Sequence, residues 1–322
     1  MSFVRTILGD IDVSALGVCY AHEHVILDRS YATEKFPHLL LDSVDSAAVE
    51  LKEFYRAGGR AMIDAMPCGG GRNVLKLAEI SRRTGVQIVS ATGLHLQKYY
   101  PHGHWSERLG AERLAEAFIA DIEQGIDAND YCGIEVERTR HRAGIIKVAG
   151  GLNRLSDWEK KVFSAAAVAH RQTGAPILTH TEKGTAALEQ IELLKSLGVD
   201  IGRVILSHTD RIPDFVYHRE ILSTGVNVEL DGAARWRENE GNPTRDLVVD
   251  LFEAGHGGQI MLGMDAARRS YWKVYGGAPG LDFLLRGFSD DLMAAGLDKA
   301  HLEQIFVHNP ARVFAFSVRG CE

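Results

Sequence analysis

Cysteine is scarce in this chain of 322 residues. The four that occur are far apart in the sequence and form no Cys-x-x-Cys pair: Cys19, Cys68, Cys132 and Cys321. This spacing argues against a disulfide framework and against a structural zinc knuckle. We therefore expect reduced thiols, most of them buried.

Long apolar runs are missing as well. No segment approaches the roughly 20 apolar residues that a membrane span requires. The N-terminal stretch MSFVRTILGDIDVS also lacks the continuous apolar run of a signal peptide. These features predict a cytoplasmic protein without a membrane partner.

Clustered positive charge is a third absence. Lys and Arg number 36 against 43 Asp and Glu, which gives a formal net charge of −7, and the basic residues are scattered. Nucleic-acid binding normally requires a basic patch or stripe. We therefore expect a small-molecule substrate and no nucleic-acid partner.

What the sequence does contain is a regular alternation of short apolar runs with longer segments of helical periodicity, which is typical of βα units and a parallel sheet. The expected strands are residues 17–21, 60–65, 87–91, 144–148, 176–179, 203–207, 226–230 and 259–263. The expected helices are residues 46–57, 73–84, 111–125, 156–173, 185–197, 214–223 and 242–254.

Eight strands with intervening helices favour a (β/α)8 TIM barrel. A doubly wound sheet is disfavoured because no Gly-x-Gly-x-x-Gly follows the first strand. We find no linker or composition shift, so we expect one α/β domain over residues 1–322, preceded by a short N-terminal β extension. Glycines just past four helices, and Ser156 followed by Glu159 at the start of another, are typical of helix ends and of a capping box.

The segment AHEHV places His22 and His24 two residues apart, directly after the first expected strand. In extended backbone, residues i and i+2 point to the same side, so both imidazoles can reach one metal ion. Alone, the pair is also compatible with ordinary surface histidines.

Further polar residues stand at the ends of other expected strands. They are Lys147 in GIIKVAG, His180 in ILTHTEKG, His208 in VILSHTDR and Asp265 in IMLGMDAARR. Each has an alternative structural interpretation, such as a hydrogen-bonded histidine or a helix-capping aspartate. A lysine within an apolar strand is harder to explain, because a buried ammonium is costly unless it is paired or chemically altered. The strand ends of a barrel converge on one mouth, so the set predicts a metal site.

This order of His-x-His, Lys, His, His and Asp is similar to the phosphotriesterase-like branch of the amidohydrolase superfamily. The resemblance extends to the segments VRTILGDIDVSALGVCYAHEH, EQGID and HNPARVF, and so covers nearly the whole chain. It implies that Lys147 is carboxylated to a carbamate that bridges two divalent metal ions. The implied ligands are His22, His24 and Asp265 for the more buried ion, and His180 and His208 for the more exposed one. Such ligands suit zinc, and also manganese, cobalt or iron.

The chemistry expected of such a centre is hydrolysis. A hydroxide bridging the two metal ions would attack the substrate, and Asp265 is the expected proton acceptor. His208 and Asp210 either relay that proton or orient neighbouring groups. No Ser or Cys nucleophile is required, and the sequence has no Gly-x-Ser-x-Gly.

Cationic and aromatic residues follow the seventh and eighth strands. Arg268 and Tyr271 stand three residues apart after Asp265, and Arg235 and Arg237 lie in DGAARWRENEG. Arginine binds phosphate and carboxylate in a bidentate fashion, so these residues predict an anionic substrate. The arrangement resembles the family subset that hydrolyses lactones of phosphorylated five-carbon sugar acids (5-phospho-pentono-1,4-lactones), with Arg237, or otherwise Arg235, as the basic partner. Alternatively, the arginines form salt bridges on a solvated loop.

Three functional hypotheses follow. The first is a lactonase for phosphorylated sugar lactones, and the second is a phosphotriesterase or another ester or amide hydrolase on the same metal centre. The third is a metal-containing scaffold without activity, which the complete ligand set argues against.

Other residues near the expected mouth receive weaker assignments. The turn of Gly69, Gly70, Gly71 and Arg72 either cradles an anion or only makes a tight turn. The segment after the third strand is expected to line or cover the pocket through His95, Tyr99, His102, His104 and Trp105, to which we assign no chemistry. Barrels of this type often pair through their outer surfaces, so a homodimer is expected.

Overall fold

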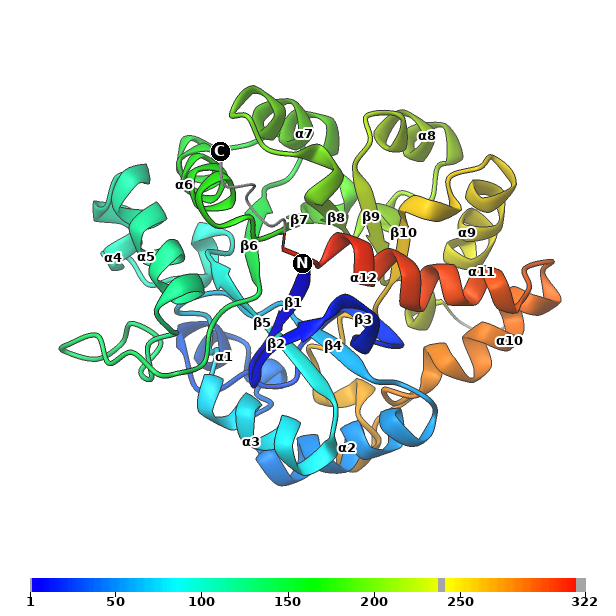
Figure 1. Ribbon diagram of the computed structural model, residues 1–322, viewed down its shortest axis with the longest axis horizontal. Helices are drawn as coiled ribbons and strands as arrows, with labels where there is room; N and C mark the ends of the chain where they lie inside the picture. Colours follow the sequence, from blue (N-terminus) through cyan, green and yellow to red (C-terminus); the bar gives the residue numbers. More distant parts are fainter. Residues whose placement is uncertain (1, 237–240, 317–322) are drawn as a thin grey trace.

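The computed structural model describes residues 2–236 and 241–316 and contains an eight-stranded parallel sheet rolled into a barrel (Figure 1). Neighbouring strands pair in the order of the chain. The first and last strands meet where the Asp265 N–H donates to the His22 carbonyl oxygen at 3.1 Å. The strands are β3 (Cys19–Glu23), β4 (Ala61–Asp64), β5 (Gln87–Gly93), β6 (Ile145–Gly150), β7 (Ile177–Thr181), β8 (Val204–Ser207), β9 (Asn227–Leu230) and β10 (Ile260–Leu262). The predicted TIM barrel is confirmed, and each strand begins and ends within two residues of its expected position.

Helices form a ring around the barrel (Figure 1). The seven expected ones are α2 (Val44–Arg56), α3 (Val74–Thr84), α5 (Ala111–Glu123), α6 (Asp157–Thr173), α7 (Ala187–Ser196), α8 (Phe215–Ser223) and α9 (Pro243–Glu253). Shorter helices are α1 (Tyr31–Lys35), α4 (Trp105–Arg108), α10 (Gly287–Ala294), α11 (Lys299–Glu303) and α12 (Asn309–Val313). No helix within the described ranges is long and apolar enough to cross a membrane.

The helix ends follow the sequence signals. At the start of α6, the Glu159 N–H donates to Ser156 Oγ and the Ser156 N–H donates to Glu159 Oε2, which completes the expected capping box. At its end, Gly174 has φ +75°, a left-handed conformation that costs a residue with a Cβ considerably more.

A hairpin of β1 (Phe3–Thr6) and β2 (Gly9–Asp12) covers the end of the barrel where the strands begin. The Ile7 N–H donates to the Ile88 carbonyl oxygen near the start of β5. Phe3 stacks on Phe316 with ring centroids 5.0 Å apart, and the guanidinium of Arg5 lies over both rings. This hairpin is the expected β extension, and it joins the two ends of the described chain.

The barrel interior changes character along its axis. Near the hairpin it is filled by buried apolar side chains, among them Val89, Leu178, Ile205 and Met261. Toward the carboxyl ends of the strands, buried polar side chains replace them. The interior therefore supports a packed core at one end and a reactive pocket at the other.

Candidate metal centre

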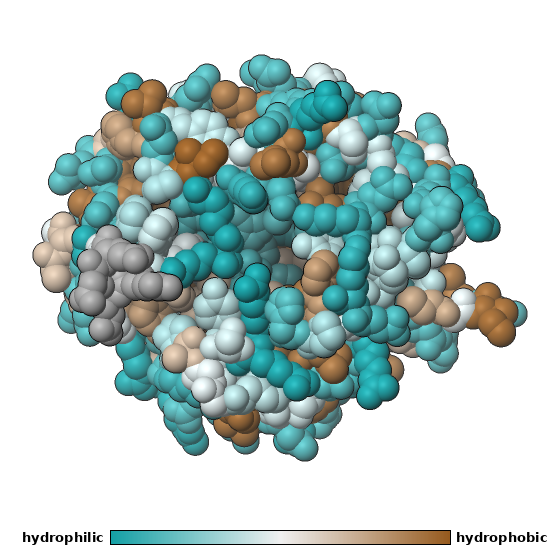
Figure 2. Space-filling view, turned by 180° about the vertical axis from the view of Figure 1, so that it is seen from behind, coloured by the Kyte–Doolittle hydropathy of each residue, from teal (hydrophilic) through white to brown (hydrophobic). Residues whose placement is uncertain are grey.

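The six predicted ligands all line one pocket at the carboxyl ends of the strands. The pocket encloses ≈ 830 Å³, and Figure 2 shows the hollow at the centre of this face. Three of the residues lie within strands: Lys147 in β6, as expected, and His22 in β3 and His180 in β7, because these two strands extend further than expected. The other three, His24, His208 and Asp265, follow strand ends.

The imidazoles and Asp265 form a contiguous group. Asp265 Oδ1 lies 3.2 Å from His24 Nε2 and 3.9 Å from His22 Nε2. The ring of His208 lies 4.8 Å from that of His22 and 4.5 Å from that of His180, measured between centroids. These separations leave room for ions among the nitrogen and oxygen atoms.

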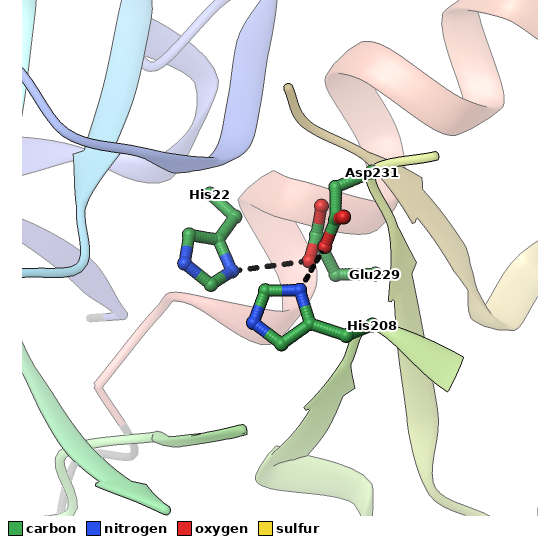
Figure 3. A group of neighbouring side chains, drawn as sticks. All are labelled: His22, His208, Glu229 and Asp231. Atoms are coloured by element: carbon green, nitrogen blue, oxygen red, sulfur yellow. Dashed lines mark hydrogen bonds and ion pairs between the residues drawn. The ribbon is translucent and has the colours of Figure 1, made fainter. Parts of the chain in front are cut away.

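Two buried carboxylates, Glu229 on β9 and Asp231 directly after it, contact two of the histidines (Figure 3). Glu229 Oε2 accepts from His22 Nδ1 at 3.2 Å, and Asp231 Oδ2 accepts from His208 Nδ1. Because the ionised Asp231 carboxylate only accepts, His208 Nδ1 carries the proton and its Nε2 keeps a lone pair for a metal ion. His22 Nδ1 also lies 3.0 Å from the Ser207 hydroxyl oxygen. Sequence reasoning missed both carboxylates, although two acidic residues in the apolar strand VNVELD are a readable signal.

A third acidic residue, Glu23, lies between the two histidines in sequence and holds the backbone around Asp265. Its carboxylate accepts from the N–H groups of Met264 and Ala266, at 2.8 and 3.3 Å. Asp265 has φ +47° and His208 has φ +67°, conformations that non-glycine residues adopt only under constraint. The fold therefore fixes these two side chains at some cost in backbone strain.

Lys147 fits the carboxylated form implied by the resemblance. The residue is 1% exposed, and its Nζ has no hydrogen-bond partner within the described part of the chain. Burial lowers the pKa of Lys147, which favours the neutral amine that reacts with carbon dioxide. Carboxylation would convert this buried amine into an anionic carbamate whose oxygen atoms can bind metal ions.

Burial also suits the histidines to metal binding. It lowers the pKa of His22 well below its ordinary value and that of His180 to about 3. Both imidazoles are therefore neutral across the physiological range, and the neutral form is the one that binds a metal ion.

The four predicted substrate residues differ in their surroundings. Arg235 Nη2 pairs with Asp265 Oδ2 at 2.8 Å, and its Nη1 lies 3.4 Å from the Tyr271 hydroxyl. Arg268 is exposed at the pocket mouth and has no ion pair with any residue in the described ranges. Arg237 lies outside the described residues. The pocket thus has one engaged arginine, one free arginine and a tyrosine hydroxyl.

Only some of the residues predicted to line or cover the pocket lie in its wall. His95 and Tyr99 line the pocket, with ring centroids 4.7 Å apart. His102 is fully exposed, and His104 stacks on Tyr100 at 4.7 Å, so neither contributes to the wall. The apolar part of the lining, here called the apolar wall, consists of Leu27, Ala32, Leu39, Met66 and Ala267.

Asp210 and Arg72, two residues with weaker functional assignments, both form hydrogen bonds or ion pairs that stabilise the fold. Asp210 accepts from the Gly232 N–H at 2.7 Å and from Thr244 Oγ1 at 2.9 Å, while Asp231 takes the position beside His208. Arg72 is buried and pairs with Asp121 at 2.9 Å, so its charge is directed away from the pocket. The Gly-rich turn before it supplies left-handed backbone at Gly69 and Gly71.

Comparisons with known proteins agree with this geometry. The model of the Phosphotriesterase family matches residues 2–314. A phospho-furanose lactonase of Mycoplasmopsis synoviae is 33% identical over 324 residues, which cover 98% of this chain and 92% of that protein. A phosphotriesterase homology protein of Escherichia coli is 32% identical over 299 residues, covering 92% and 98% respectively. The crystal structure of a lactonase from Listeria monocytogenes has a TM-score of 0.90 at 32% identity and covers 98% of this chain and 100% of that one.

Proposed function

Because the chain belongs to the phosphotriesterase family of metal-dependent hydrolases, we propose that it opens the ring of a phosphorylated sugar lactone, of the 5-phospho-pentono-1,4-lactone type. The observation that carries this proposal is the pairing of the His and Asp cluster with a free arginine, Arg268, at the mouth of the same pocket. A lactone provides the carbonyl for the cluster, and its remote phosphate provides the anion for Arg268.

The metal centre in this proposal holds two divalent ions. His22, His24, Asp265, His180, His208 and carboxylated Lys147 would bind them, with zinc as the expected metal. When bound, the ions polarise the lactone carbonyl and lower the pKa of water. The buried carboxylates Glu229 and Asp231 keep the histidine nitrogens directed at the ions.

Residues of the chain itself transfer the proton and bind the phosphate. The Asp265 carboxylate accepts a proton from the attacking water and returns it to the ring oxygen when the carbonyl carbon–oxygen bond breaks. Arg268 and the Tyr271 hydroxyl bind the phosphate, and Arg235, already directed at both Tyr271 and Asp265, lies between the phosphate side and the reacting side of the pocket. Fixing the phosphate places the carbonyl with little loss of freedom at the reaction step.

A second candidate function is hydrolysis of an uncharged ester or phosphotriester. The apolar wall of Leu27, Ala32, Leu39, Met66 and Ala267 favours it, because such a surface suits an apolar substituent. That activity would not need Arg268.

The test is hydrolysis of matched pentono-1,4-lactones with and without the 5-phosphate. The enzymes are the metal-loaded wild type, Arg268→Ala and Arg113→Ala, the last being an exposed arginine of α5 that pairs with Glu116. We expect the wild type and Arg113→Ala to prefer the phosphorylated lactone. Arg268→Ala should lose roughly 10- to 100-fold in kcat/KM on that lactone alone, since a hydrogen bond to a charged group contributes about 1.5–3 kcal/mol.

Equal rates on the two lactones would instead favour the second function, as would an Arg268→Ala variant that keeps the wild-type preference. Absence of turnover on lactones, esters, amides and phosphotriesters would favour the third hypothesis, a metal-containing scaffold without activity.

A further inference from the structure

His180 is oriented differently from the other cluster histidines. Its Nε2, rather than its Nδ1, donates a hydrogen bond to a carboxylate, Glu182 Oε2, at 2.9 Å. The lone pair available for a metal ion is therefore on Nδ1. The carboxylate is also placed differently, because Glu182 lies at the pocket rim with its side chain 23% exposed, whereas Glu229 and Asp231 are fully buried.

Glu182 is itself held by a residue from another element. Its second oxygen, Oε1, accepts from Lys98 Nζ at 3.1 Å. Lys98 belongs to a short turn after β5, Gln97–Tyr99, which also carries the pocket residue Tyr99. His180 and Lys98 thus each hold one of the two oxygens of the Glu182 carboxylate.

The backbone that follows Glu182 is constrained. Lys183 has φ +54° and Ala186 has φ +57°, both unfavourable for residues with a Cβ. Thr185 Oγ1 donates to the Glu182 carbonyl oxygen at 2.8 Å, and Gly184 accepts from the Tyr217 hydroxyl at 2.8 Å. This tight turn brings the side chain of residue 182 back onto the ring two residues before it.

We propose that Glu182 is a positioning residue that orients His180 for the more exposed metal ion, and that Lys98 holds Glu182 in place. The inference rests on the metal centre of the proposed function and adds to it a chain of contacts, Lys98–Glu182–His180. Without Glu182, the His180 ring would be free to rotate or to change tautomer, either of which withdraws Nδ1 from the ion.

The more exposed ion depends most on this contact. His208 is fixed by the buried Asp231, but His180 has no other hydrogen-bond partner on its ring nitrogens within the described residues. A carboxylate that orients a metal-binding histidine typically changes metal affinity by about 10- to 100-fold. The loss should therefore fall on one of the two ions and leave the other unchanged.

The experiment measures metal binding directly. Metal-free wild type and variants are titrated with Zn²⁺ in competition with a chromophoric chelator, which gives a dissociation constant for each of the two ions. The variants are Glu182→Ala, Glu182→Gln, Lys98→Met and, as the matched control, Glu116→Ala, which removes an exposed glutamate paired with Arg113 on α5. Circular dichroism verifies that each variant is folded.

We expect Glu182→Ala to weaken one ion by about 10- to 100-fold and the other not at all. Glu182→Gln should recover most of the affinity, because its amide oxygen still accepts from Nε2. Lys98→Met should weaken the same ion by about two- to fivefold, as expected for a partly exposed ion pair. Glu116→Ala should match the wild type.

A second readout identifies the ligating nitrogen. In protein loaded with ¹¹³Cd²⁺ and labelled with ¹⁵N-histidine, His180 should show cadmium coupling at Nδ1, and this coupling should be lost in Glu182→Ala. Coupling of His180 through Nε2 in the wild type would overturn the proposal.

Wild-type affinity for both ions in Glu182→Ala would also overturn it, as would equal weakening of both ions in the Ala and Gln variants. Neither result affects the lactonase proposal if the wild type still binds two ions and hydrolyses lactones. A wild-type protein that binds fewer than two ions would refute the metal centre itself.

Discussion

Two buried polar clusters of this barrel differ in how completely the chain satisfies them. The first, here called the Asp121 cluster, consists of Arg72, Asp121, Asp130, Tyr131 and Arg138. Within it, Asp121 Oδ1 accepts from Tyr131 and Arg138, each at 2.6 Å. Its Oδ2 accepts from Arg72 and Thr92, each at 2.9 Å.

The metal centre is the opposite case. Lys147 Nζ, His24 Nδ1 and Glu229 Oε1 are buried without a hydrogen-bond partner in the parts of the chain that the structure describes. A buried polar atom left unpaired costs about 1–3 kcal/mol. The comparison shows that protein atoms satisfy both oxygens of Asp121, whereas three polar atoms of the metal centre have no such partner. The one buried atom of the Asp121 cluster that lacks a hydrogen bond within the described residues, Arg72 Nη2, still lies 3.0 Å from Asp130 Oδ1 in an ion pair.

The largest effect is expected from Lys147→Met, which removes one of the unpaired polar groups of the metal centre. Losing the proposed bridging ligand should remove metal binding and reduce activity by at least about 1,000-fold, because metal ions contribute several kcal/mol of transition-state stabilisation. The metal-free variant should be as stable as the wild type or more so, since an unpaired buried amine is removed. Urea unfolding of the metal-free proteins checks the second statement, and a clear loss of stability would contradict it.

A substitution in the Asp121 cluster should have the opposite effect: it should lower stability, and the loss should not depend on metal. Asp121→Ala removes the closest carboxylate from the buried guanidinium of Arg72 and should lower the free energy of unfolding by about 3–5 kcal/mol. The loss should be equal with and without metal. Glu116→Ala, which breaks an exposed pair, is the control and should cost at most about 1 kcal/mol. An Asp121→Ala variant as stable as this control would show that the cluster is dispensable.

Metal removal sharpens the comparison without mutation. Chelation should lower the free energy of unfolding by about 2.7 kcal/mol for each ion that had been present at 100 times its dissociation constant. Lys147→Met should show no such change, whereas the metal-dependent difference should persist in Asp121→Ala. Thermal unfolding with and without added Zn²⁺ measures it, and an identical transition for the wild type in both conditions would argue against resident metal.

The smallest expected effect concerns two histidines outside the predicted ligand set. Burial lowers the pKa of His170 and His218, and each donates through Nδ1 to a backbone carbonyl oxygen. The unfolded chain therefore takes up these protons first, so the stability they contribute is present above about pH 6.5 and is lost as pH falls below it. The difference in unfolding free energy between metal-free wild type and His170→Asn should shrink from pH 7 to pH 5. A constant difference would contradict the assignment.

The sequence was sufficient for the parts of this molecule that depend on local pattern. Short runs of mostly apolar residues form the barrel strands, which are three to seven residues long. His22, His24, His180 and His208 stand out because a polar residue at a buried strand end is unusual. The topology of the barrel then brings residues that are 243 positions apart, such as His22 and Asp265, within 3.9 Å.

The sequence alone could not identify which side chains pair with one another. Nothing near Arg72 in sequence identifies Asp121, 49 residues away, as its partner, and a lone arginine beside three glycines reads equally well as an anion site. The same holds for Glu229 and Asp231, whose importance depends on which imidazole nitrogen they contact. Side-chain hydrogen bonds between distant elements follow from three-dimensional packing and not from periodicity.

The N-terminal hairpin has a practical consequence. Phe3 and Phe316 stack at the end of the barrel opposite the pocket. A protein attached to a solid support at a residue beside Phe3 or Phe316 should therefore present its pocket to the solution, with the full depth of the barrel between support and substrate. Enzyme immobilised in this way is then expected to meet substrate as readily as enzyme free in solution.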